Sequence, residues 1–335
     1  MKDERISLAH GDGGELAHKL IQAVFVEAFE HNEYARFDAA IFPAPSEKMA
    51  VTTDSFVVKP IFFPGGNIGK LAIAGTVNDL AVSGMVPQYL TAGFIIEEGF
   101  KVKELKEIVH SMAQEAKKAE VRIVAGDTKV VERGSIDGIY INTTGIGFAH
   151  PLHTIQPELM EEGDSIIVNG TIGDHGIAIL SARGELGIQT NLQSDCAALN
   201  GLTASALDSL DGIRIMRDPT RGGLATTLVE IAEDFHVTME IEEEEIPIRN
   251  EVKGACDILG YDPLYLANEG KVIFIVKKEQ EEQLLQILKQ HEFGQNAKVI
   301  GHLTGKEKGA LHLKTGLGST RKLHRLSGMM LPRIC

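Results

Sequence analysis

Three aspartates in the first half of the chain occupy positions where a carboxylate needs an explanation. Asp54 interrupts a β-rich run, Asp79 interrupts a small and apolar helical face, and Asp127 follows a buried-type strand in the order Gly-Asp-Thr-Lys. A carboxylate is costly to bury unless a partner or a metal ion compensates its charge. A strand that ends in Gly-Asp-Thr, followed by Lys129, suits the edge of a magnesium–nucleotide site. A solvated strand end explains Asp54 equally well, and a local turn cap explains Asp127 equally well.

Two glycine-containing stretches are candidates for phosphate binding. Residues 11–14, Gly-Asp-Gly-Gly, precede a helical stretch and could lay backbone N–H groups on phosphate oxygens, although a flexible lead-in is the simpler explanation of a lone tetrapeptide. Asp12 would sit beside phosphates only with a cation between them. Residues 62–70 superficially resemble a Walker A loop, but Pro64 replaces its first glycine and Leu71 replaces the Ser or Thr that binds magnesium. The chain is therefore not a P-loop enzyme.

The second half contributes three further motifs, each weak alone. Residues 170–176 read Gly-x-x-Gly-x-x-Gly, which is not the dinucleotide-binding fingerprint, so a Rossmann fold is excluded. Residues 217–223 lead into a helix that Asp218 or Thr220 could simply cap. Residues 268–271, Asn-Glu-Gly-Lys, precede an expected strand at 272–276.

Composition restricts the class of protein. The chain has 335 residues, a formal net charge of -14, 43% hydrophobic residues and 24% charged residues, which is typical of a globular protein with room for two domains. The charge argues against nucleic acid as the main partner, because phosphate-backbone binding needs clustered Lys and Arg. No run approaches the roughly 20 apolar residues of a membrane span, and the first residues lack the apolar core of a secretory signal. We therefore expect a cytoplasmic protein with neither nucleic acid nor membrane as a partner.

The last eight residues of the sequence hold a thiol in an unusual place. Cys335 is the final residue, and Gly328 and Pro332 are poor continuers of a helix or central strand, so the segment reads as an arm. Eight extended residues reach roughly 25 Å, enough to carry one sulfur between two sites. A disordered end with an accidental cysteine is the simpler reading of the tail alone. Cys196 and Cys256 have no paired spacing, and we interpret them as buried packing residues in a reducing compartment.

The elements that must position these residues follow from hydrophobic periodicity. The pattern predicts an α/β chain in which an N-terminal helical stretch is followed by strands and helices in alternation, with a helix-like run that ends near Ser83. We expect strands at 49–58, 87–97, 121–125, 139–148, 164–168 and 272–276, and helices at 102–120, 224–235 and 279–291. Two short strands after the last helix complete the expected fold.

Together and in this order, the motifs resemble the HypE family of hydrogenase maturation factors, within the superfamily typified by aminoimidazole ribonucleotide synthetase and selenophosphate synthetase. The resemblance covers essentially the full length. Its most specific part is Pro-Arg-Ile-Cys at 332–335, which the synthetases lack, whereas Asp12 departs from the small residue expected in the N-terminal glycine loop. The residues that carry the resemblance are 10–11, 53–55, 62–70, 75–84, 126–131, 173–176, 218–223, 268–271 and 332–335.

This resemblance implies an α+β (mixed α/β) fold of the PurM-like type with two domains. We expect a glycine-loop segment and helix at 1–38, a strand-rich ATP-binding and dimerisation domain at 39–150, a C-terminal α+β domain at 151–327 and a mobile tail at 328–335. Two N-terminal domains are expected to pair, so that the protein is a homodimer.

The reaction implied by the resemblance takes place on the protein's own cysteine. A carbamoyl group delivered by the carbamoyltransferase HypF becomes a thiocarbamate on Cys335, ATP-dependent dehydration converts it to a thiocyanate, and the cyanide passes to iron on the HypC–HypD complex. ATP is needed because oxide is a very poor leaving group, whereas phosphate leaves readily. The implied enzyme is an ATP-dependent carbamoyl dehydratase that supplies the cyanide ligand of nickel–iron hydrogenase.

The resemblance also implies roles for individual residues. Asp54, Asp79 and Asp127 are the expected Mg²⁺ ligands, with Lys129 beside the phosphates. Glu269 is the expected base for the thiocarbamate nitrogen, because the glycine after it lets the backbone approach closely; an exposed turn residue is the alternative. Second choices are Lys70, Asp218, Arg221 and His175, which could equally hold structure or line the channel of the tail. The expected ATP-binding residues are Gly11, Gly13, Gly14, Asp54, Lys70, Asp79, Asp127 and Thr128.

Two functions from other classes stay open. A small-molecule ATP-dependent synthetase of the same superfamily would remain active without Cys335 and release a phosphorylated product. A non-catalytic carrier would present a carbamoylated Cys335 that ATP never converts. The mass of the intact protein, before and after carbamoylation and addition of ATP, separates these functions.

Overall fold

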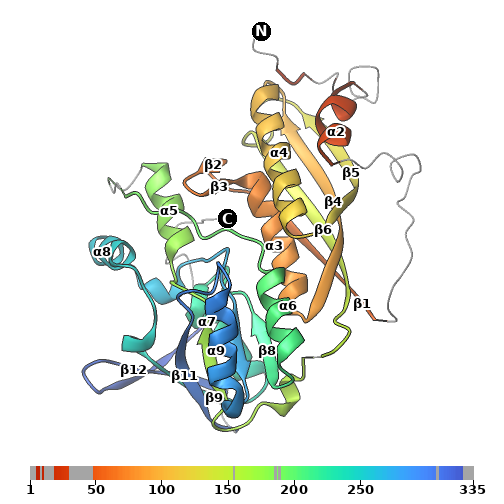
Figure 1. Cartoon of the computed structure of the whole chain (residues 1–335). Helices are drawn as coiled ribbons and strands as arrows, with labels where there is room; N and C mark the ends of the chain where they lie inside the picture. Colours follow the sequence, from red (N-terminus) through yellow and green to blue (C-terminus); the bar gives the residue numbers. More distant parts are fainter. Residues whose placement is uncertain are drawn as a thin grey trace. The chain divides into compact units, whose positions relative to one another are not determined.

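The computed structural model describes residues 5–7, 10, 19–29, 48–153, 155–184, 187, 190–306 and 309–326. The chain forms two compact units (Figure 1). Unit 1 contains residues up to Phe62, together with Gly66–Leu80 and Met85–Ala149, and unit 2 contains Phe63–Gly65, Ala81–Gly84 and the residues from His150 on. The glycine loop at 11–14 and the tail with Cys335 lie outside the described residues.

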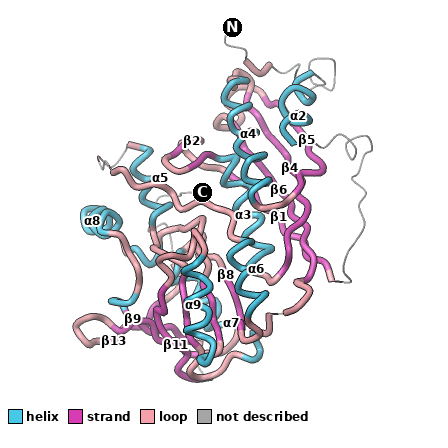
Figure 2. Tube along the Cα trace, viewed as in Figure 1, coloured by secondary structure: helices cyan, strands magenta, loops and turns pink. Residues whose placement is uncertain are grey.

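Unit 1 is built on a four-stranded sheet with the strand order β1-β6-β4-β5 (Figure 2). The pairs β1–β6 and β4–β6 are antiparallel, and β4 and β5 are parallel. The strands are β1 (Met49–Phe56), β4 (Met85–Glu97), β5 (Arg122–Val131) and β6 (Ile139–Ala149). The short strands β2 (Phe62–Phe63) and β3 (Gly66–Asn67) form a separate hairpin.

Helices α3 (Ile68–Val82) and α4 (Val102–Lys118) cover one face of this sheet (Figure 1). Nearly every side chain of α3 is buried, as expected for its small and apolar sequence, whereas α4 buries a single apolar stripe. Every second residue of β4 from Leu90 to Ile96 is buried toward these helices. The short η2 (Ile21–Val26) and α2 (Glu27–Phe29) pack near α4.

The other face of the unit 1 sheet is not covered by any residue that the structure describes. Four large apolar side chains on or beside this face are strongly exposed, namely Met49 and Val51 at 58%, Val57 at 46% and Ile95 at 42%. An uncovered sheet face that carries exposed apolar side chains beside an edge strand is a surface for association with another chain.

Strand β5 differs from the expectation of a strand that ends at Ala125. The strand continues through Gly126 and Asp127 to Val131, so the expected strand end and turn at 126–129 are wrong. The reason is its parallel pairing with β4, which extends to the partners Glu97 and Val131. A Cβ at Gly126 would lie 2.7 Å from the carbonyl oxygen of Ala92, so this glycine allows close approach of two strands.

Unit 2 is built on a seven-stranded sheet with the order β13-β12-β9-β11-β7-β10-β8. Neighbouring strands are antiparallel except β9 and β12, which are parallel. The strands are β7 (Ser165–Val168), β8 (Ile213–Arg217), β9 (Thr238–Glu242), β10 (Ile273–Val276), β11 (Lys298–Gly305), β12 (Ala310–Lys314) and β13 (Thr320–Leu323). Among the described residues, three strands follow α9 (Glu281–Gln290), where only two were expected. Strand β13 was not predicted because most of its residues are polar and exposed.

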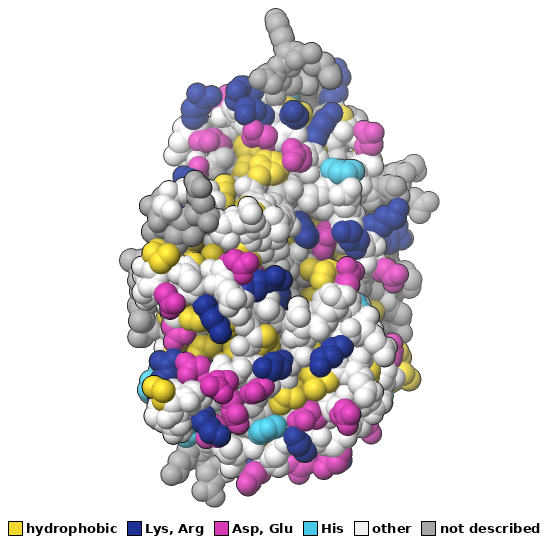
Figure 3. All heavy atoms as spheres, turned by 60° about the vertical axis from the view of Figure 1, so that its left-hand side comes forward, with side chains coloured by type: hydrophobic (Ala, Val, Ile, Leu, Met, Phe, Trp, Pro, Cys, Tyr) yellow, Lys and Arg dark blue, Asp and Glu magenta, His cyan; other side chains and the backbone are white. Residues whose placement is uncertain are grey.

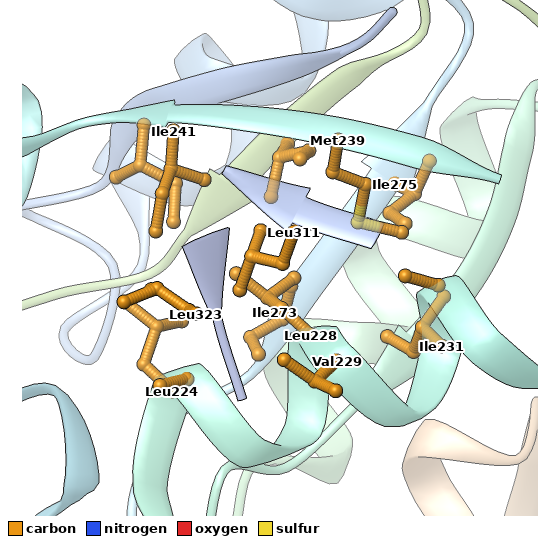
Figure 4. Packing of buried hydrophobic residues seen from close by; sticks show 14 of the residues in the cluster. Leu224, Leu228, Val229, Ile231, Met239, Ile241, Ile273, Ile275, Leu311 and Leu323 are labelled. Atoms are coloured by element: carbon orange, nitrogen blue, oxygen red, sulfur yellow. The ribbon is translucent and has the colours of Figure 1, made fainter. Parts of the chain in front are cut away.

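Both faces of the unit 2 sheet carry a hydrophobic core. Ile273 and Ile275 of β10 pack with α7 (Gly223–Asp234), whereas Phe274 and Val276 lie in the core that includes α6 (Asn200–Ser209) and α9 (Glu281–Gln290). Figure 4 shows the first of these cores, with Leu228 and Ile231 of α7 facing the strands. Strands buried on both faces are largely apolar, which explains the continuous apolar run of β10 and the apolar residues that follow Ser165 in β7.

A third, smaller apolar cluster joins α5 (Asp174–Arg183) and α8 (Asn250–Leu259). The connecting single turns of 3-10 helix are η4 (Pro157–Leu159), η5 (Glu243–Glu245), η6 (Pro263–Tyr265) and η7 (Lys278–Gln280). None of the described helices combines the length and the apolar character required to cross a membrane. Acidic and basic side chains are interspersed on the face of the molecule in Figure 3, so its negative charge is not gathered into one patch there.

Candidate functional site

Asp54 and Asp79 face the same layer of unit 1, between the sheet and α3. The hydroxyl of Thr52 donates a hydrogen bond of 2.8 Å to Oδ2 of Asp79. Asp54 follows Thr52 by two residues on β1, so both side chains point to the same face of the strand. Phe56, two residues further on, lies against Gly75 of α3. The structure therefore directs the half-buried Asp54 toward the stretch of α3 that carries Asp79.

Asp127 and Lys129 lie on the opposite face of the same sheet. In the register of β4 and β5, Asp127 is the partner of Gly93, which lies between the buried Ala92 and Phe94. Asp127 and Lys129 are accordingly exposed, whereas the intervening Thr128 is partly buried toward the helices. Within a single chain, Asp127 therefore lies apart from Asp54 and Asp79.

The start of α3 holds Lys70 in a defined position. Oδ1 of Asn67 accepts hydrogen bonds from the backbone N–H groups of Gly69 and Lys70, at 2.9 and 3.1 Å. A side-chain oxygen that bonds the first free N–H groups is a helix cap, so Asn67 fixes where α3 begins. Lys70 itself is half-buried.

No group of three or more His, Cys, Asp and Glu side chains within the described residues could hold a metal ion by itself. Mg²⁺ is usually bound by one or two carboxylates, with phosphate oxygens and waters as the other ligands. Asp54 and Asp79 fit this donor set, because they are two acidic side chains directed to one layer. The assignment of Asp127 to the same ion stays a prediction.

In unit 2, Glu269 is buried, with only 8% of its surface exposed, so it is not an exposed turn residue. Its backbone N–H donates to Oδ1 of Asp195 at 3.1 Å, and its carbonyl oxygen accepts from the N–H of Ala197 at 3.3 Å. At the next residue, Gly270, an added Cβ would overlap the carbonyl oxygen of Asp195. Glycine is therefore required here for close approach of two backbone segments.

A buried ion pair lies directly beside this turn. Nζ of Lys271 is 2.9 Å from Oδ2 of Asp195, and the two side chains are 9% and 4% exposed. Lys271 also donates to the carbonyl oxygen of Gly270 at 3.2 Å. Burial alone would raise the pKa of Asp195, but the charges of Lys271 and the added hydrogen bonds hold this pKa below its usual value. Asp195 is therefore a carboxylate at neutral pH.

His175 completes this buried cluster as a neutral group. Its ring Nδ1 shares a hydrogen bond of 2.8 Å with Oγ of Ser194, and the ring meets Phe63 edge-on at 5.7 Å between centroids. Burial disfavours the imidazolium and lowers the pKa of His175 to about 4, against the opposing influence of Asp195. The preceding Asp174 has its pKa raised by burial, and its Oδ1 is buried without a hydrogen-bond partner among the described atoms.

Three motifs that are distant in sequence meet at Asn268. Oδ1 of Asn268 accepts from the N–H of Gly173 at 2.7 Å, and its Nδ2 donates to the carbonyl oxygen of Pro219 at 2.9 Å. The segments 170–176, 217–223 and 268–271 are thereby held together in unit 2. Near this junction Asp218 is half-buried and Arg221 is exposed.

The two described cysteines are both free and buried, which confirms their interpretation as packing residues. Burial, together with Asp262 and Asp257, raises the pKa of Cys256 to about 11. Cys196 is 2% exposed. Neither thiol is therefore suited to act as a nucleophile at neutral pH.

Two protein-family models match the chain. The N-terminal domain of AIR synthase related proteins matches residues 36–149, and the C-terminal domain of these proteins matches residues 161–314. Carbamoyl dehydratase HypE of Rhodobacter capsulatus is 46% identical over an alignment of 338 residues, which covers 100% of this chain and 99% of that protein. This chain belongs to the HypE family.

Solved structures of HypE proteins agree with this assignment. A HypE structure in complex with ATP matches with a TM-score of 0.92 at 42% identity, covering 98% of this chain and 99% of that one. A chain of a HypE–HypF complex matches with a TM-score of 0.80 at 48% identity, covering 92% of this chain and 99% of that one. The predicted HypE family, the mixed α/β fold with its two domain types and the carbamoyl dehydratase class are confirmed.

Asp195 was not predicted as a site residue from the sequence, and Lys271 was given no role. Lys271 was part of the motif at 268–271, but nothing local indicated a buried partner for its charge. Asp195 stands in Gln-Ser-Asp-Cys, which has neither a glycine pattern nor a clear periodicity. Their ion pair joins residues far apart in the chain, so only the folded structure reveals it.

Proposed function

We propose that this member of the HypE family uses ATP to dehydrate an S-carbamoyl group on Cys335 to a thiocyanate. The cyanide would become a ligand of the iron in nickel–iron hydrogenase. The observation that carries the proposal is the match over the whole length to a carbamoyl dehydratase, with a solved relative in complex with ATP. Cys335 lies outside the described residues, and its role rests on the resemblance of 332–335 to the family.

The proposed reaction balances as a transfer of oxygen to phosphate. The carbamoyl oxygen attacks the γ-phosphorus of ATP, the bond between that phosphorus and the β–γ bridging oxygen breaks, and ADP leaves. The carbon–oxygen bond then breaks, the nitrogen loses two protons, and a carbon–nitrogen triple bond forms while phosphate carries the oxygen away. Such a reaction depends on alignment and on neutralisation of charge.

Glu269 is the proposed base for the protons on nitrogen. A base must be held within hydrogen-bonding reach of its proton, and the backbone of Glu269 is bonded through both its N–H and its carbonyl group. The burial of this side chain suits a reaction from which water must be kept away, because water would hydrolyse the carbamoyl group.

Unit 1 would bind the nucleotide. Asp54 and Asp79 would hold Mg²⁺, which when bound neutralises charge on the phosphates. Asp127 and Lys129 lie on the opposite sheet face of the same chain, so they would reach this ion and its phosphates only from a second copy of the chain. The remaining proposed ATP contacts are Gly11, Gly13, Gly14, Lys70 and Thr128.

Three partners belong to the proposal. A second copy of the chain would cover the open face of the unit 1 sheet, where Met49, Val51, Val57 and Ile95 are exposed. A carbamoyltransferase of the HypF type would load the cysteine, in keeping with the solved HypE–HypF complex of a relative. A HypC–HypD complex would accept the cyanide on iron. We place these steps in the cytoplasm, where a thiol stays reduced.

Mass spectrometry of the intact protein tests the reaction. After carbamoylation, addition of Mg-ATP should remove the mass of one water from the wild-type chain, and Cys335→Ser should show no such loss while it still binds ATP. Cys256→Ala is the matched control and should react as the wild type does. Loss of water from the Cys335→Ser variant would refute the proposal, and a free phosphorylated product in its place would indicate a small-molecule synthetase.

A further inference from the structure

The turn that carries Glu269 is held by one short segment of unit 2, residues 195–197. Both backbone hydrogen-bonding groups of Glu269 have their partners there, namely Oδ1 of Asp195 and the N–H of Ala197. The close contact at Gly270 leaves no room for the two segments to slide past each other. The position of the Glu269 side chain therefore depends on where this segment lies.

Asp195 serves this turn with both of its carboxylate oxygens. Oδ1 accepts from the N–H of Glu269, and Oδ2 pairs with Nζ of Lys271 at 2.9 Å. Lys271 in turn donates to the carbonyl oxygen of Gly270. One buried carboxylate thus contacts both Glu269 and Lys271, the residues on either side of Gly270.

Stability alone does not explain a buried ion pair at this place. Removing two charges from water costs free energy that their attraction repays only partly, and apolar residues of similar volume are often as stable or more stable. A second buried pair in unit 2, Asp164 with Arg214 at 3.1 Å, lies at the other end of β7 from the turn. The two ion pairs are similarly buried but differ in their position relative to the turn, so substitutions in them can be compared.

We infer that Asp195 and Lys271 are positioning residues for Glu269, in that Asp195 fixes the Glu269 backbone by hydrogen bonding and Lys271 holds the Asp195 side chain in place. The inference rests on the proposed role of Glu269 as the base. Asp195 and Lys271 act through Glu269 and not on the carbamoyl group, so their loss reduces the rate of dehydration and leaves the affinity for ATP intact.

Two charge-balanced double variants of the full chain test the inference. Asp195→Asn with Lys271→Met keeps an oxygen that accepts from the N–H of Glu269, whereas Asp195→Leu with Lys271→Met has the same shape without an acceptor. We expect the Leu variant to dehydrate the carbamoylated protein at least about tenfold more slowly per folded molecule than the Asn variant, because a small misplacement of a catalytic group costs on this order. Calorimetry should give both variants the same Kd for ATP.

Controls separate positioning from folding. Asp164→Asn should lower the melting temperature and leave the rate per folded molecule at the wild-type value. If the Leu variant does not fold, Asp195→Ala with Lys271→Met takes its place in the same comparison. Equal rates for the variants with and without the acceptor overturn the inference, provided that Glu269→Gln is slow. A Glu269→Gln variant with the wild-type rate overturns both the inference and the proposed role of Glu269.

Discussion

His175 is a single buried residue whose charge state should be visible in the stability of the whole protein. Its pKa is lowered from the ordinary 6.5 to about 4 by burial. Between these two values the unfolded chain binds a proton on this ring and the folded chain does not. Stability therefore falls as pH falls from 6.5 to about 4, and this contribution is constant above and below that range.

We predict that His175→Asn removes this part of the pH dependence. The amide keeps a polar atom near Oγ of Ser194 but does not titrate. Urea unfolding at several pH values should show that the wild type loses about 1–3 kcal/mol more than the variant between the two pKa values. Identical pH dependence of the two proteins would show that folding does not lower the pKa of His175.

A substitution at Asp79 can distinguish a structural role of its carboxylate from a role in binding Mg-ATP. Asp79→Asn keeps the volume and an oxygen for the hydroxyl of Thr52 but removes the charge. We expect the affinity for Mg-ATP to fall by at least about tenfold, since even outer-shell partners of a metal contribute that much. Calorimetry with Mg-ATP measures the change, and Asp137→Asn, an exposed partner of Lys59, is the control. An early-melting variant with wild-type affinity would mark Asp79 as a structural residue.

At the scale of the element, the turn at 268–271 depends on the absence of a side chain. Gly270→Ala would place a Cβ on the carbonyl oxygen of Asp195, so the backbone of the turn must move. We expect a destabilisation of about 1–3 kcal/mol or more, together with slow dehydration, because overpacking displaces Glu269.

The control for this element is Gly254→Ala in α8, where an added Cβ meets nothing within 4 Å. That substitution should stabilise the protein by about 0.5–1 kcal/mol, since alanine is the better helix former. Denaturant titrations of both variants measure the two effects. A Gly270→Ala variant as stable as the wild type would show that the close contact is not required.

At the scale of the whole molecule, the open face of the unit 1 sheet predicts a homodimer. Val51→Lys places a charge on this face, at a side chain that is 58% exposed in the single chain. We expect the wild type to be a dimer by light scattering at micromolar concentration and the variant to be a monomer, because burial of an unpaired lysine is costly. Ile258→Lys, on the equally apolar but isolated Ile258 of α8, should remain a dimer. A monomeric wild type would refute the interface.

Sequence alone determined the family, the mixed α/β class and most of the elements, because these depend on local patterns. The amphipathic period of 102–120 and the apolar run of 272–276 indicate α4 and β10 whatever surrounds them. The order of the motifs along the chain was sufficient for the resemblance to HypE, which the full-length matches confirm.

Only the tertiary structure decides which of the candidate site residues lie close together. Asp54 and Asp127 look alike in sequence, but the register of β4 and β5 puts Asp127 on the opposite sheet face, and no local pattern specifies a register between strands. The same holds for Asp195, which meets Glu269 and Lys271 across more than 70 residues of chain. Such contacts arise when distant segments of the chain pack together. Here Gly270, which has no side chain, lets its backbone approach that of Asp195 closely, and only the folded structure shows this contact.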